Sequence, residues 1–163
     1  MAKSRHNQAP DGPPTMAAGG PVGYALVQAA KAHKAHAAVL LREIGLYPAQ
    51  ELVLMHLWDV DDRSQADLVR SLNLDASTVT RTVARLDEQG IVCRRPSSDD
   101  GRAVIVSLTS RGRQLCDEVG RVWGELEAAA TSGMSDRQRA DMLRGLRRMT
   151  STLSSTDPTT GKG

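Results

Sequence analysis

Apolar residues recur at three- and four-residue steps through the first part of the chain, which is the period of one helix face. We therefore predict a long amphipathic helix from Val22 to about Ile44. The run AQELVLMHLWDV follows Pro48 and is almost wholly apolar. It predicts a second helix, opened by Pro48 in its first turn, buried on all sides and ending near Asp61.

Two shorter helices with clear start signals come next. Ser64 and Asp67 resemble a capping box ahead of a short third helix, which Asn73 and Leu74 would end as a tight connection. Asp75 can cap a fourth helix that runs to Gln89, because its carboxylate can accept the free amides of the first turn. Gly90 supplies the stop signal expected after a last helical turn.

After Gly90 the apolar period changes from helical spacing to strict alternation. IVCRR, the polar turn PSSDDG and RAVIVSL together predict a β-hairpin. Thr109 then caps a fifth helix that Gly133 breaks, and Ser135 with Gln138 opens a sixth helix as a second capping box. The sixth helix carries Met142, Leu146, Met149 and Leu153 on one face.

This element order predicts a mainly α fold with a small β-hairpin wing: a winged helix-turn-helix domain with a helical dimerisation region. We expect disordered tails at 1–21 and 154–163, because these segments hold too little apolar surface to repay chain ordering. The ranges between them would be a dimerisation helix at 22–46, the winged helix-turn-helix region at 47–113 and dimerisation helices at 114–153.

Composition narrows the class of protein further. The 163 residues are 40% hydrophobic and only 2% aromatic, with no Phe, so one aliphatic core is expected. The formal charge is only +2, but 63–113 holds nine arginines, no lysine and six acids. Two cysteines without a CxxC motif, and no apolar run of about 18 residues, favour a reduced, cytoplasmic protein that does not enter a membrane.

The fourth helix carries the main candidate site. Its apolar face leaves short hydroxyls near the amino end and arginines farther along, a set that a DNA major groove accepts. The third helix and its Leu74 turn would brace it. The candidate DNA-binding residues on these two helices are Ser64, Gln65, Ser77, Thr78, Thr80, Arg81 and Arg85.

The hairpin extends this candidate site. Arg94, Arg95 and Arg102 surround its Pro- and Gly-containing turn, and a thin ribbon carrying arginine can reach a minor groove. A carboxylate beside DNA is repelled by phosphate. Asp100 is therefore expected to orient the guanidinium of Arg102 for insertion into the minor groove. An ordinary surface ion pair between the two residues is the alternative.

The stretch LNLDASTVTRTVARLDEQGIVCRRPSSDDGRAVIVSLTSRG resembles the MarR family of bacterial transcription regulators. The resemblance lies in STVTR with VxRL, in Gly90, in the DxR pattern from Asp100 to Arg102 and in SLTSRG. It implies a homodimer built by the first, fifth and sixth helices, double-stranded DNA as partner and Arg102 in the minor groove. The sequence departs from the family pattern at Gly101, where a second arginine is common, and at Tyr47, where Thr is common.

The same resemblance implies a small organic effector, phenolic or lipophilic, in a cleft lined from the first, second and fifth helices. Met55, His56 and Trp58 are candidates there by location only. It also makes repression the commoner mode of action, with a pseudo-palindromic operator.

Three alternatives stay open at this point. A protein-interaction module could keep the fold without binding DNA. His33, His36 and His56 could converge on zinc, and Cys93 or Cys116 could sense oxidation. An enzyme is not expected, because no nucleophile with its base, phosphate loop or buried carboxylate pair appears at a recognisable spacing. No cofactor or metal is predicted.

Overall fold

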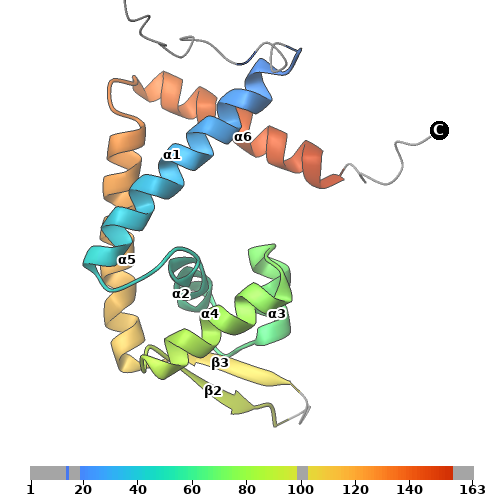
Figure 1. The fold of residues 1–163 in the computed structure, drawn as a ribbon, viewed down its shortest axis with the longest axis vertical. Coiled ribbons are helices and arrows are strands. Elements are labelled where there is room, and N and C mark those ends of the chain that lie inside the picture. Colours follow the sequence, from blue (N-terminus) through green and yellow to red (C-terminus); the bar gives the residue numbers. More distant parts are fainter. Residues whose placement is uncertain (1–13, 15–18, 99–102, 156–163) are drawn as a thin grey trace, which may run out of the picture. The chain divides into compact units, whose positions relative to one another are not determined.

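The computed structural model describes residue 14 and residues 19–98 and 103–155 (Figure 1). The chain divides into two compact units, which comprise residues 1–126 (unit 1) and residues 127–163 (unit 2). Unit 1 holds a bundle of helices and a small sheet, and unit 2 consists mainly of one helix. The tails predicted at 1–21 and 154–163 lie largely outside the described residues.

The first helix confirms the amphipathic prediction. α1 spans Pro21–Glu43, with Pro21 in its first turn, and buries Ala37 and Leu41. Its end follows from local geometry, because Gly45 takes a positive φ of 76° and the amide of Leu46 donates to the carbonyl of Leu41 over 2.8 Å. This turn directs Leu46 into the core, where it is fully buried.

The second helix begins later and is less buried than the sequence predicts. α2 spans Gln50–Asp59, and the residue before it, Ala49, is left-handed with φ 79°. Pro48 therefore lies in a turn ahead of the helix, which is closed by the Tyr47 amide donating to Gln50 Oε1 over 2.8 Å. The outer face of α2 exposes 37% of Met55 and 53% of Trp58, so only one side of this helix is core.

Both capping predictions for the next helices are confirmed. α3 spans Gln65–Leu72 with the Ser64 hydroxyl accepting the Asp67 amide, and α4 spans Ala76–Glu88 with Asp75 accepting the Thr78 amide. Asn73 connects them in a left-handed conformation, φ 51°. The two helices contact each other and α2.

The hairpin is present and gains a third strand. β2 spans Val92–Pro96 and β3 spans Val104–Leu108, paired antiparallel with Cys93 opposite Ser107. A two-residue strand, β1 (Arg63–Ser64), pairs with the other edge of β3. The sheet order is therefore β1-β3-β2, and β1 ties the start of α3 to the wing.

The core of unit 1 is aliphatic, as the composition predicts. Leucines and valines from α2, α3, α4 and the sheet are fully buried around one centre. They include Val53, Leu54, Leu57, Leu68, Val79, Val83, Leu86 and Val106. The buried side of α4 is thus fixed, and its opposite side faces outward.

The fifth helix follows β3, and its first turn packs against Ile91, in the loop between α4 and β2. α5 spans Ser110–Ala130. The Thr109 amide donates to the Ile91 carbonyl over 3.1 Å, and the Thr109 hydroxyl accepts the Gly112 amide over 3.1 Å. A Cβ on Gly112 would lie 2.1 Å from the Ile91 carbonyl oxygen. Only glycine therefore allows this approach of α5 to the base of the hairpin.

Unit 2 contains α6, which spans Asp136–Ser155. The predicted capping box is present, because the Ser135 amide donates to Gln138 Oε1 over 2.8 Å. α6 buries none of its residues, and Met142, Leu143, Leu146 and Leu153 are 39–65% exposed. These exposed side chains form an apolar stripe along α6.

Candidate nucleic-acid interface

One face of α4 is polar, exposed and free of core packing. Val79, Val83 and Leu86 occupy the buried face. On the outward side, Ser77, Arg81 and Arg85 are exposed and Thr78 is half-buried. The sequence predicted this division correctly, because the hydrophobic positions recur at helical spacing.

Asp75 organises the two hydroxyls at the start of this face. Its Oδ1 accepts the Ser77 hydroxyl at 2.5 Å and the Thr78 amide at 2.8 Å, and its Oδ2 accepts the Thr78 hydroxyl at 2.6 Å. These hydrogen bonds hold the pKa of Asp75 well below its usual range, the Ser77 hydroxyl having the largest effect. Both hydroxyls donate to Asp75, so each keeps its lone pairs as acceptors.

Gln65 and Thr80 link the two helices through an exposed hydrogen bond. The Gln65 side-chain amide donates to the Thr80 hydroxyl over 2.8 Å, and that hydroxyl donates to the Ala76 carbonyl over 2.7 Å. Both residues were predicted as DNA-binding candidates. Here they brace α3 against α4 and so fix the orientation of the exposed face.

Ser64 has a similar local role. Its hydroxyl donates to Asp67 Oδ2 over 2.6 Å and accepts the Asp67 amide over 3.0 Å. The hydroxyl lowers the pKa of Asp67 by favouring its charged form. Ser64 also lies in β1, opposite Ile105, so the amino end of α3 is held by both its cap and the sheet.

The wing carries exposed arginines next to α4. α4 contacts β2, and Arg94 and Arg95 are exposed on that strand. Arg95 Nη2 forms a 3.0 Å ion pair with Asp62 Oδ1. The remaining predicted wing residues, Asp100 and Arg102, lie outside the described residues, together with Gly101.

Two consecutive aspartates at the foot of the wing were missed by the sequence reading. Asp61 Oδ1 accepts the Leu108 amide over 2.9 Å, and Asp61 Oδ2 pairs with Arg113. Asp62, at a positive φ of 54°, accepts hydrogen bonds from the hydroxyl of Ser107 and from Arg95. These bonds, the Ser107 hydroxyl first, lower the pKa of Asp62. The signal available was an Asp-Asp pair after a helix, since Asp tolerates left-handed turns.

Known proteins share this arrangement. The sequence profile described as the MarR family matches residues 46–104. A solved structure of a probable transcriptional regulator from Pseudomonas aeruginosa is 30% identical, covers 80% of this chain and 97% of its own, and superposes with a TM-score of 0.71. The chain belongs to the MarR family. Its winged helix fold is the one that the sequence predicted.

Two further comparisons place this MarR-family chain among its relatives. An uncharacterized HTH-type regulator, YdgJ of Bacillus subtilis (strain 168), is 36% identical over 70 residues, which is 43% of each chain. The matched segments span about half the length of the curated relatives. Bordetella bronchiseptica BpsR, a protein whose DNA binding is regulated by 6-hydroxynicotinic acid, has a solved structure and is 28% identical. It covers 79% of this chain and 98% of its own, with a TM-score of 0.73.

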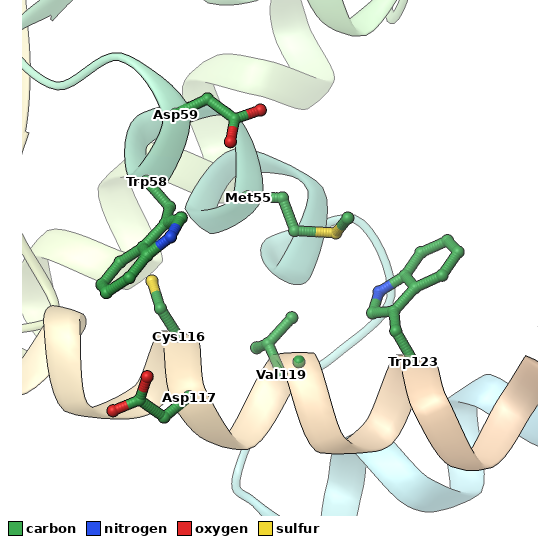
Figure 2. Close-up of a pocket in the computed structure, with 8 residues that line it drawn as sticks. Met55, Trp58, Asp59, Cys116, Asp117, Val119 and Trp123 are labelled. Carbon is green, nitrogen blue, oxygen red and sulfur yellow. The ribbon is translucent and has the colours of Figure 1, made fainter.

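Unit 1 of this MarR-family chain also contains a cavity of about 350 Å³ between α2 and α5. Met55 and Trp58 line it, as their location suggested, while His56 does not. His56 Nδ1 lies 3.4 Å from Arg63 Nη1 instead. Figure 2 shows the indoles of Trp58 and Trp123 at opposite ends of the cavity.

A second cavity, of about 500 Å³, lies among α1, α2, α4 and α5. Lys34, Glu51 and Trp123 are among its lining residues. Glu51 is only 7% exposed, and within the described part of the chain its buried Oε2 has no hydrogen-bond partner. Burial raises the pKa of this carboxyl, so its charge is held at a free-energy cost.

The described histidines and cysteines lie in different surroundings. His33 packs against Trp123, with ring centroids 5.8 Å apart. Across the described residues no group of three or more His, Cys, Asp or Glu could hold a metal ion. Cys93 is exposed on β2, while Cys116 is half-buried with its pKa raised mainly by burial. Within the described chain no helix is long and apolar enough to cross a membrane.

Proposed function

We propose that this chain is a sequence-specific DNA-binding transcription regulator, and not an enzyme. The observation that carries the proposal is the exposed face of α4, where Ser77, Thr78, Arg81 and Arg85 stand on a helix braced by α3. Such a helix fits a major groove, where hydroxyls bind base edges and arginine forks onto guanine. BpsR, which shares the fold, is a protein whose DNA binding is regulated.

The wing supplies the second contact in this proposal. Exposed Arg94 would neutralise phosphate, and Arg102 would enter the minor groove, steadied by Asp100. Arg95 is assigned a different part. Its ion pair with Asp62 holds β2 to the end of α2, so it positions the wing.

DNA selection from a random pool tests the proposal. We expect an inverted repeat whose half-sites are about 10 base pairs apart, because a two-fold dimer presents two α4 helices. Arg81→Ala should weaken binding about 5- to 150-fold if Arg81 contacts a guanine. Arg137→Ala is the matched control, because this substitution removes the same charge at a site on α6 that is 92% exposed.

Failure to enrich any sequence, even at low salt, would contradict DNA reading. A MarR-like protein-interaction module would then be the better description. Salt dependence separates the two, because each neutralised phosphate steepens the fall of affinity with salt concentration. A protein interface need not show that slope.

A homodimer is part of the same proposal. Val22, Val27 and Val39 on α1 are 48–64% exposed, and α6 leaves Leu143, Leu146 and Leu153 uncovered. Apolar stripes of this size are covered best by a second copy. Light scattering should give twice the chain mass of 17.5 kDa, and Leu146→Glu should shift the protein toward monomer.

Regulation completes the proposal. The protein would act in the cytoplasm as a repressor. Binding of a small organic molecule in the α2–α5 cavity would release it from its operator, and this release would relieve repression. A reporter gene behind the selected operator tests the sign of regulation. Expression of the reporter should rise when the gene for this protein is deleted. A fall in expression would identify an activator instead.

A further inference from the structure

The cavity between α2 and α5 has an unusual lining for a site of its size. Eight residues enclose it: Met55, Trp58, Asp59, Cys116, Asp117, Val119, Gly120 and Trp123. The chain has two tryptophans, and both are here. Figure 2 shows the thioether of Met55 between the two indoles and the thiol of Cys116 next to the Trp58 indole.

All the formal charge on this lining is negative. Asp59 comes from the last residue of α2 and Asp117 from α5, and no lysine, arginine or histidine is among the lining residues. Figure 2 places both carboxylates at the Trp58 side. Arg113, one turn before Asp117, has its guanidinium engaged by Asp61. His33 approaches the Trp123 ring from α1.

This combination favours one class of ligand. Indole faces attract cations through the ring quadrupole, and a thioether adds a soft, polarisable contact. Carboxylates at the rim attract the same charge and repel an anion.

We propose that the α2–α5 cavity binds lipophilic aromatic cations and that such a cation is the effector of this regulator. The first half concerns binding to the free protein. The second half rests on the DNA-binding function proposed above. The two halves are measured separately.

Binding is tested on the full chain with tetraphenylphosphonium and tetraphenylborate, which match in size and shape and differ in the sign of charge. At pH 8 and low salt, calorimetry should show one phosphonium bound per chain at least tenfold more tightly than the borate. Tryptophan emission should change on binding, because both fluorophores line the cavity. Equal or tighter binding of the borate would overturn the ligand class.

A matched pair of double variants assigns the preference to the cavity. Asp59→Asn with Asp117→Asn should reduce phosphonium affinity about fivefold and abolish the preference over borate. Glu43→Gln with Glu88→Gln removes two exposed carboxylates that do not line the cavity and should leave both affinities unchanged. An equal loss in both double variants would mean that net charge, not this site, selects the cation.

The effector role is tested on the protein bound to its selected operator. Phosphonium should release the DNA at the concentration that fills the cavity, and the Asp59→Asn, Asp117→Asn variant should need about five times more. Cation binding without DNA release would support the ligand class and overturn the effector role. If the protein does not bind DNA under any condition, the proposed function is wrong. Calorimetry would still show whether the cavity prefers a cation.

Discussion

The side-chain amide of Gln65 on α3 donates a 2.8 Å hydrogen bond to the hydroxyl of Thr80 on α4. The Thr80 hydroxyl is therefore occupied on both sides, because it also donates to the Ala76 carbonyl. This contact fixes how α4 is presented. It assigns Gln65 and Thr80 to supporting the exposed face.

Thr80→Val is expected to loosen this junction without changing the volume of the side chain much. A hydrogen bond of this kind contributes about 1 kcal/mol to stability. A double-mutant cycle with Gln65→Met, followed by urea unfolding, should give a coupling of about 0.5–1.5 kcal/mol. Gln28→Met, which removes an exposed bond to Tyr24 on α1, should show no coupling to Thr80→Val.

Asp75→Ala should lower the Tm by a few degrees, because the first-turn amide of α4 loses its acceptor. The folded protein holds the pKa of Asp75 below its unfolded value. The carboxylate therefore contributes stability above the unfolded pKa and loses it as pH falls toward the folded pKa. Thermal scans from pH 7 to pH 2 should show less acid destabilisation in the variant. An identical slope in both proteins would argue against this linkage.

Glu51→Gln should stabilise the fold by about 1 kcal/mol at pH 7, because it removes a buried charge with an unpartnered oxygen. The sign of the pH effect is opposite to that at Asp75. Burial raises the folded pKa of Glu51, so its penalty is present above that pKa and fades as pH falls toward the unfolded pKa. Urea unfolding should show the gain shrinking between pH 7 and pH 4.

Gly112→Ala should destabilise by about 3 kcal/mol or more, because its Cβ would overlap the Ile91 carbonyl oxygen. Gly124, on the same helix, has nothing within 4 Å of an added Cβ. Gly124→Ala should therefore stabilise the protein by up to about 1 kcal/mol, through helix propensity. Chemical denaturation of the two variants compares the crowded and the open position. Similar losses at both would show that backbone conformation, and not the Ile91 contact, sets the effect.

Local patterns were enough to predict most of the fold and the outward face of α4. Caps at Ser64, Asp75 and Ser135 depend on residues three positions apart, and the buried face of α4 depends on helical spacing. What the sequence did not reveal depends on contacts between distant residues. β1 forms only because Arg63 meets Val106, and the Asp61 contact with Leu108 joins positions 47 residues apart.

The start of α2 was also misplaced, for a related reason. Pro48 suits a first helical turn, but Ala49 adopts a left-handed conformation that a sequence pattern does not announce. The hydrogen bond between Gln65 and Thr80 was not predicted either, because it joins side chains 15 positions apart on two helices. DNA contact by these two residues stays a prediction.

The contacts of Thr109 couple local unfolding of the hairpin base to that of α5. Its amide bonds to the Ile91 carbonyl and its hydroxyl bonds to the Gly90 carbonyl, while Gly112 lies against Ile91. The base of the hairpin and the first turn of α5 therefore cannot separate one after the other. We therefore expect a single local unfolding unit, in which the amides of Ile91, Thr109 and Gly112 share one opening free energy in hydrogen–deuterium exchange.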